Sequence, residues 1–166
     1  MFKNILKNNL LSFVTVFIIF FIDRISKFYV LSLANYESEL DIYLNQYLNI
    51  YLIWNKGIAF GLLTFDESFV YNVISLIIII TIIVVLVMVI RTNGVRRYSL
   101  ISILGGSIGN LFDRIYYSAV PDFIDFHINN FHWFIFNVAD IFITLGVICL
   151  IYAEIFFKNR KDEKLI

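Results

Sequence analysis

Residues 68–90 run without a single charged side chain and consist largely of Ile, Val and Leu. A helix of about 20 residues crosses the roughly 30 Å hydrocarbon core of a bilayer. Further uncharged stretches occupy 8–22, 98–112 and 126–153, the last interrupted only by Asp140. The chain is 60% hydrophobic and 16% charged, whereas roughly half of the residues of a soluble domain are apolar. The sequence therefore predicts an integral membrane protein.

We expect a single integral membrane domain over residues 1–166 that is all-α within the bilayer. Four transmembrane helices are predicted from length and hydrophobicity, near 10–33, 68–90, 97–117 and 134–157. The first is long enough only if it includes Asp23, Arg24 and Lys27, and the third only if it includes Asp113 and Arg114. With Asp140 in the fourth, charged residues are thus predicted inside three of the four spans.

Lys and Arg are distributed unequally between the two sets of connections. Residues 1–9, the loop at 91–97 and the tail after residue 157 are rich in these cations, whereas 34–67 and 118–133 together hold only Lys56. Cytoplasmic loops carry the excess of Lys and Arg, so both termini are predicted to be cytoplasmic. The formal net charge is zero, which gives no indication of a nucleic-acid partner.

The connections at 34–67 and 118–133 are predicted to form a small extracytoplasmic β-platform. Residues 42–54 are aromatic and β-branched with partial alternation, which favours one or two short strands followed by a turn at 55–57. Residues 58–69 suit a short interfacial helix anchored by phenylalanines. Around Pro121 the pattern suits a short edge strand or an extended loop.

Polar residues of three predicted helices fall at one depth, near the outer membrane face. With a rise of about 1.5 Å per residue and both termini inside, they lie in the outer half of the first helix or the outer third of the third and fourth. These residues are Asp23, Asn110, Asp113, Arg114, Asn137 and Asp140. An aspartate at mid-membrane costs about 2.5–3.5 kcal/mol on insertion scales, so several at one depth indicate a shared polar pocket.

Spacing along the helices suggests which of these groups pair. Asp23 and Lys27 are four residues apart on one helical face and are predicted to pair beside the pocket. Asp113 is predicted to meet a partner on another helix. Gly105 and Gly109 form a G-x-x-x-G pattern, which permits close helix packing.

Two carboxylates can meet at the outer boundary, Asp140 from the fourth helix and either Asp122 or Asp125 from the loop before it. Two close carboxylates in a low-dielectric site share a proton and titrate as a coupled pair. Such a pair supplies the base and the acid needed to add water to an amide. An acid–base hydrolase is therefore favoured, and spacing leaves the choice between Asp122 and Asp125 open.

Other chemistries have weaker support. His127 and His132 are five residues apart outside a helix, without an H-E-x-x-H pattern, so we expect no metal and no other cofactor. The single cysteine, Cys149, excludes an intrachain disulfide and a cysteine-based metal site. A small polytopic channel or transporter that uses the outer-leaflet polar cluster is the alternative function, although an ion pathway would require carboxylates at several depths.

Five motifs appear in order between residues 23 and 140. They are DRISK at 23–27, NKGIAFG at 55–61, GGSIGNLFDR at 105–114, VPDFIDF at 120–126 and FNVAD at 136–140. With this set the chain resembles the bacterial lipoprotein signal peptidases, the type II signal peptidases, which are aspartic peptidases of the membrane. The resemblance implies a four-helix membrane enzyme with a small outer β-platform and a short interfacial helix.

The resemblance also implies roles for individual residues. Asp122 and Asp140 would be the catalytic pair. The residues expected to line or support the site are Asn55, Gly57, Asn110, Arg114, Asn137, Asp23 and Lys27. Where the family usually has Gln, this chain has Arg24, which we expect to snorkel outward or to tilt its helix.

The substrate implied by the resemblance is a diacylglyceryl-modified prolipoprotein, cut just before its lipidated cysteine. The expected location is the bacterial cytoplasmic (inner) membrane, with the active site near the outer face. Membrane lipids and an inhibitor of the globomycin type are the other expected partners, and we expect a monomer.

Overall fold

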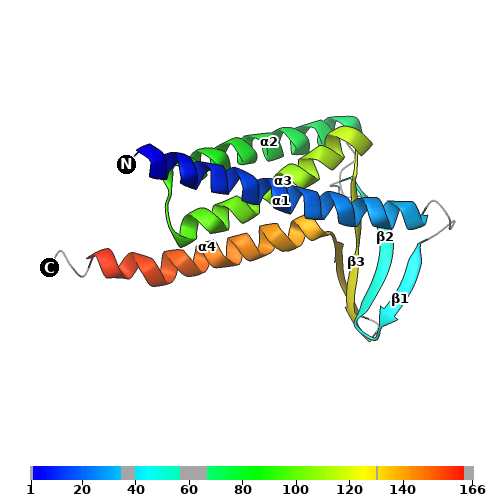
Figure 1. Ribbon diagram of the computed structural model, residues 1–166. Helices are drawn as coiled ribbons and strands as arrows, with labels where there is room; N and C mark the ends of the chain where they lie inside the picture. Colours follow the sequence, from blue (N-terminus) through cyan, green and yellow to red (C-terminus); the bar gives the residue numbers. More distant parts are fainter. Residues whose placement is uncertain (1, 35–39, 57–66, 130, 163–166) are drawn as a thin grey trace.

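The computed structural model describes residues 2–34, 40–56, 67–129 and 131–162 and contains four helices and a four-stranded sheet in these ranges. The helices are α1 (Phe2–Ala34), α2 (Glu67–Arg91), α3 (Val95–Tyr117) and α4 (Val138–Asp162). The strands are β1 (Asp41–Asn45), β2 (Leu48–Asn55), β3 (Val120–Ile128) and β4 (Phe131–Phe136). The sheet lies at one end of the helices, and α1 begins and α4 ends at the other (Figure 1).

Three helices of the described chain are long and apolar enough to cross a membrane. The candidate spans are Asn9–Ala34, Tyr71–Arg91 and Val138–Phe156. Large apolar side chains such as Phe17, Leu76 and Ile148 are more than half exposed. Exposed apolar surface of this extent suits contact with lipid and not with water, so this is a membrane protein.

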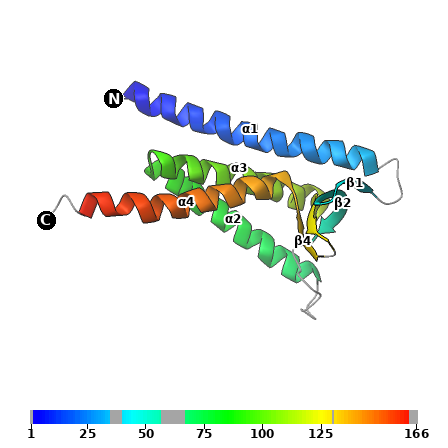
Figure 2. The ribbon, with the colours of Figure 1, turned by 90° about the horizontal axis from the view of Figure 1, so that it is seen from below.

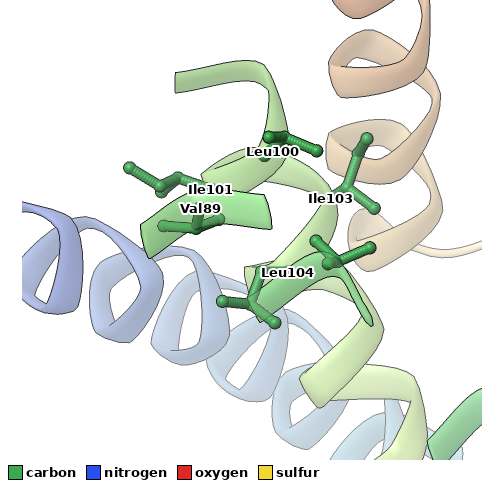
Figure 3. Packing of buried hydrophobic residues seen from close by; sticks show 6 residues of the cluster. Val89, Leu100, Ile101, Ile103 and Leu104 are labelled. Carbon is green, nitrogen blue, oxygen red and sulfur yellow. The ribbon is translucent and has the colours of Figure 1, made fainter. Parts of the chain in front are cut away.

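Helix α3 differs because its middle, residues 99–111, has no exposed side chain. It packs against α1, α2 and α4, and Figure 2 shows it between α1 and α4. Leu100, Ile101 and Leu104 of α3 form a buried cluster with Val85 and Val89 of α2 (Figure 3). A helix shielded by its neighbours can carry small and polar residues that a lipid-facing helix cannot.

Glycines set how closely α3 approaches its partners. A Cβ on Gly105 would lie 2.8 Å from the Cβ of Ile19 in α1, and one on Gly106 would lie 2.5 Å from the carbonyl oxygen of Ala139 in α4. Gly109 faces Asp23 in the same way, at 2.7 Å from a carboxylate oxygen. The predicted close packing at Gly105 and Gly109 is thus present, and α1 is the helix that approaches.

The β-platform is larger than the sequence indicated. All four strands pair antiparallel in the order β1-β2-β3-β4, so β3 is a central strand and the expectation of an edge strand or loop is wrong. Pro121 is tolerated because it pairs with Trp54 of β2, while pairing with β4 starts further along, at Ile124. The missing N–H of this proline therefore interrupts no bond to β4.

The fourth helix begins later than predicted. Residues 134–136, assigned to the helix from the sequence, belong to β4, and α4 starts at Val138. Their apolar and aromatic side chains fit a strand as well as a helix, and pairing with β3 decides the outcome. The predicted turn at 55–57 and interfacial helix at 58–69 lie mostly outside the described residues.

A second apolar cluster fixes the sheet to the helices. Its buried centre consists of Val30 of α1, Leu40 just before β1, and Phe123 of β3. Val138 at the start of α4 packs against it. Burial of such side chains contributes about 1.5–3 kcal/mol each. The cluster therefore holds β3 beside the N-terminus of α4.

Candidate active site

The first turn of α4 is closed by a reciprocal pair of side chains. The backbone N–H of Asp140 donates to the Asn137 side-chain oxygen at 3.2 Å, and the backbone N–H of Asn137 donates to an Asp140 carboxylate oxygen at 3.1 Å. This is a capping box, in which two otherwise unpaired helix N–H groups are satisfied. The negative charge of Asp140 also lies at the positive end of the helix dipole. Local helix chemistry therefore fixes the carboxylate of Asp140.

Asn137 also contacts the second carboxylate. Its side-chain N–H donates to Asp122 Oδ1 at 2.6 Å, while Asn55 from the end of β2 donates to Asp122 Oδ2 at 2.9 Å. One side chain thus bridges Asp122 of β3 and Asp140 of α4. The structure brings Asp122, and not Asp125, to this bridge.

The environment of Asp122 favours its protonated form. The residue is 2% exposed, and burial raises the pKa of its carboxyl from 3.8 to about 6. Hydrogen bonds from Asn137 and Asn55 lower this pKa, and the nearby charge of Asp140 raises it. A carboxyl with this pKa exchanges protons near neutral pH, as acid–base catalysis requires.

Asn110 connects the carboxylates to a cation. Its side-chain N–H donates to Asp140 Oδ1 at 2.8 Å, and its oxygen accepts a hydrogen bond of 3.0 Å from Lys27 Nζ. Both oxygens of Asp140 therefore have donors, one from α3 and one from the cap of α4. This fixes the rotamer of Asp140 from two sides.

Beneath the two carboxylates lies a cluster of buried ions. Lys27 Nζ is 2.9 Å from a carboxylate oxygen of Asp23 and 2.6 Å from one of Asp113. All three side chains are almost completely buried. The predicted pairing of Asp23 with Lys27 and the predicted partner for Asp113 on another helix are both confirmed. Asp23 also accepts the Ala139 backbone N–H at 3.0 Å, which ties α1 to the start of α4.

Of the two expectations for Arg24, outward snorkelling or a tilted helix, the structure contradicts the first. Its guanidinium donates to Asp113 Oδ2 and to Asp23 Oδ2, each at 2.7 Å, and its side chain is 17% exposed. It also stacks over Phe112, 4.8 Å from the ring centre. The sequence showed the charge but not its partner, because Asp113 lies 89 residues further along the chain.

Arg114 is buried but carries unused donors. Its Nε and one terminal nitrogen have no hydrogen-bond partner among the described residues. Its guanidinium lies 5.8 Å from the ring centre of Tyr71, whose hydroxyl bonds the Arg114 carbonyl. A buried guanidinium with free N–H groups is able to bind an incoming carbonyl or anion. Gly57, also expected at the site, lies outside the described residues.

An apolar groove of about 240 Å³ opens beside Asp140. It lies between β4 and the first turns of α4. Besides Asp140, the residues that line it are Phe134, Phe136, Ile141, Thr144 and Leu145. An apolar group bound in this groove would lie next to one of the two carboxylates.

Asp125, His127 and His132 form a separate cluster on β3 and β4, with ligand atoms within 4.8 Å of one another. In the sequence the two histidines form only a weak pattern, because their spacing does not reveal the β3–β4 hairpin. The hairpin pairs His127 directly with His132.

Fold and site together define a membrane protein in which Asn137 links two aspartates, Asp122 and Asp140, at the end of the helices. The Signal peptidase (SPase) II family matches residues 15–156. This chain belongs to that family. No comparison supports the channel or transporter alternative.

Named relatives agree with this assignment over nearly the whole chain. A lipoprotein signal peptidase of Pelagibacter ubique (strain HTCC1062) is 52% identical over 159 residues, covering 96% of each chain. One of Anaplasma phagocytophilum (strain HZ) is 36% identical, covering 96% of this chain and 99% of its own. A bacterial membrane enzyme solved by the in meso method at 1.9 Å is similar with a TM-score of 0.71 and 28% identity, covering 86% of this chain and 90% of its own.

Proposed function

We propose that this protein is a membrane aspartic endopeptidase that removes signal peptides from diacylglyceryl-modified prolipoproteins by cutting just before the lipidated cysteine. The observation that carries the proposal is the bridge from Asn137 to both Asp122 and Asp140. It supports these two aspartates as the catalytic pair. Membership of the signal peptidase II family supplies the reaction class.

The carboxylate pair can perform the hydrolysis without a metal. One carboxylate takes a proton from water as the water oxygen attacks the scissile carbonyl carbon, and the protonated partner donates to the carbonyl oxygen. The tetrahedral diol then collapses: the C–N bond breaks, the leaving nitrogen takes a proton from one carboxyl, and a diol hydroxyl returns its proton to the other carboxylate. The pair titrates as a unit, so the proton belongs to both aspartates.

Arg114 is the proposed donor for the developing oxyanion or the substrate backbone. Its free N–H groups are buried, where a hydrogen bond to charge that develops in the transition state is strong. It lies one turn from Asn110 on the same face of α3, and Asn110 already contacts Asp140. Asn55 and Asn137 hold Asp122 in place, and Asp23 and Lys27 support the site from below.

The apolar groove beside Asp140 is a suitable place for part of the lipid anchor or the signal helix. Each buried CH₂ of an acyl chain contributes about 0.8 kcal/mol, and binding energy remote from the scissile bond can be used to position that bond. A lipidated cysteine held at the membrane surface would bring its preceding peptide bond to the level of the carboxylates.

We propose a four-span topology with α3 as the span that composition alone does not reveal. It is long enough to cross the bilayer, and the three other helices pack around its middle. Its buried polar residues then need no contact with lipid. The Lys and Arg distribution places both termini in the cytoplasm and the sheet outside, in a bacterial inner membrane. We also propose a monomer that a globomycin-type inhibitor blocks.

The test is cleavage of a diacylglyceryl-modified prolipoprotein by purified wild-type protein and by Asp122→Asn and Asp140→Asn. Each substitution keeps the shape of the side chain and removes its proton chemistry, so cleavage should fall by at least about 10²–10⁴-fold. Asp41→Asn, on exposed β1 of the same sheet, is the matched control and should cleave normally.

Correct folding of each variant is checked by its thermal unfolding temperature in detergent. A folded Asp122→Asn or Asp140→Asn protein that still cleaves at near-normal rate would remove that residue from the pair. A folded wild-type protein that leaves the lipidated substrate intact would overturn the proposed function itself.

A further inference from the structure

Three side chains with metal-binding atoms converge on the β3–β4 hairpin, away from the proposed catalytic pair. Asp125 and His127 are two residues apart and share one face of β3. His132 lies directly opposite His127 on β4, so its side chain is on that face as well. Asp122 is three residues from Asp125, and alternation places it on the other face.

The distances within this cluster are close to those of a coordination shell. The Asp125 carboxylate oxygens are 2.9 and 3.1 Å from His132 Nδ1, and one of them is 3.6 Å from His127 Nδ1. The two imidazole rings stack with their centres 5.0 Å apart. Tetrahedral zinc, with ligands at about 2.0–2.1 Å, separates neighbouring ligand atoms by roughly 3.4 Å.

A second observation points to a missing partner. The side chain of His127 is 10% exposed, yet its Nδ1 has no hydrogen-bond partner among the described residues. Asn49 of β2 lies opposite Asp125, and its buried Oδ1 likewise has no hydrogen-bond partner among the described residues. Leaving a buried polar atom unsatisfied costs about 1–3 kcal/mol, and a bound cation would satisfy the imidazole nitrogen.

We propose that Asp125, His127 and His132 bind a divalent transition-metal ion, of which Zn²⁺ is the best match. Two imidazoles and one carboxylate suit zinc, whereas calcium and magnesium require oxygen ligands. The side chain of His132 is 57% exposed, so the metal can reach the site and water can complete its coordination. The ion joins β3 to β4, the hairpin that carries Asp122 and leads directly into Asn137 and α4 (Figure 1).

The chain is well suited to a direct test because it contains two histidines and one cysteine in total. Protein without a histidine tag is stripped of metal with chelator in detergent and titrated with Zn²⁺ by calorimetry. X-ray absorption at the zinc edge then reports imidazole ligands, which can come only from His127 and His132. We expect one equivalent of Zn²⁺ bound through two imidazoles.

The test variant is His132→Gln, and the matched control is Ile128→Gln. Both residues are exposed positions on the same hairpin, so the two substitutions should affect folding similarly. Loss of a ligand should raise the Zn²⁺ dissociation constant at least about 100-fold, and the control should leave it unchanged. Zn²⁺ binding that is absent, or equally tight in His132→Gln, would overturn the proposal.

The readout is separate from peptidase activity. Wild-type protein treated with chelator should still cleave lipidated prolipoprotein, because the carboxylate pair activates the water. A protein that binds Zn²⁺ as described but never cleaves would refute the proposed function and leave the metal site standing. A protein that cleaves the substrate but does not bind Zn²⁺ would refute the metal site and leave the proposed function standing.

Discussion

Asn137 serves two purposes with one side chain. Its oxygen caps α4, and its N–H group holds Asp122. The N-x-x-D spacing of the capping box was visible in the sequence, but the bond to Asp122 depends on the position of β3. The position of Asp140 near the start of the last helix could therefore be predicted from residue order, whereas the choice of Asp122 over Asp125 rested on family resemblance until the strand was placed.

The raised pKa of Asp122 predicts a specific pH dependence of stability. Its folded-state pKa of about 6 exceeds the ordinary 3.8, so the folded protein binds the proton more tightly than the unfolded chain. The favourable contribution is fully present below about pH 4 and is lost as pH rises through about 6. The thermal unfolding temperature of wild type, relative to Asp122→Asn, should therefore fall between about pH 4 and pH 7.

Asp41→Asn serves as the reference for general effects of pH on the detergent-solubilised protein. The curve of Asp41→Asn is recorded over the same range as that of wild type. If the difference between wild type and Asp122→Asn stayed constant with pH, the pKa of Asp122 would not be raised.

At the scale of elements, α3 determines how the site is assembled. Uncharged runs in the sequence indicated the helices, since hydrophobic length is a local property. The four-stranded sheet and the end of β4 at residue 136 were not predicted, because strand pairing depends on segments far apart in the chain. Gly106 and Gly146 both lie at the α3–α4 contact. Substitutions at these two glycines can distinguish a loss of helix packing from a change in the geometry of the proposed catalytic pair.

Gly106→Ala should reduce both stability and cleavage. The new Cβ would lie 2.5 Å from the Ala139 carbonyl oxygen, and backbone must move to relieve this contact. The first turn of α4, with Asp140, would shift. Overpacking of this kind costs about 1–3 kcal/mol, measured as a lower unfolding temperature, together with a lower kcat per folded molecule.

Gly146→Ala is the matched comparison. Its Cβ would meet the Ser99 carbonyl oxygen at 2.7 Å, nearly two turns of α4 further from the carboxylates. Stability should fall by a similar amount while kcat per folded molecule changes little. Equal losses of kcat in the two variants would show that α4 moves as a rigid unit and not locally at Asp140.

At the scale of the whole molecule, the sheet lies at one end of the helices, and the start of α1 and the end of α4 lie at the other (Figure 1). If the helices cross the bilayer, the sheet and the α2–α3 turn must face different compartments. Charge distribution in the sequence predicted which compartment each faces. Tyr43 on β1 and Asn93 in the α2–α3 turn are both exposed. Each can therefore be labelled to determine the compartment that its end of the molecule faces.

Cysteine labelling tests this orientation. In a Cys149→Ala background, Tyr43→Cys should react with a membrane-impermeant maleimide in intact bacteria. Asn93→Cys should react only after the membrane is opened, because the proposed topology places its turn in the cytoplasm. The opposite pattern would invert the topology, and equal labelling in intact cells would rule out a bilayer between the two positions.

The buried ions beneath the site have a further consequence for biogenesis. Helix α1 brings Arg24 and Lys27 against Asp23, an excess of one positive charge, and Asp113 of α3 matches it. Ribosomes complete α1 long before Asp113 exists, since 89 positions separate it from Arg24. A charge unmatched in hydrocarbon costs about 2.5–3.5 kcal/mol on insertion scales. We therefore expect the nascent first helix to insert incompletely into the bilayer until the third helix leaves the translocon. A chain truncated before α3 would keep an unpaired positive charge, which cellular quality control can recognise.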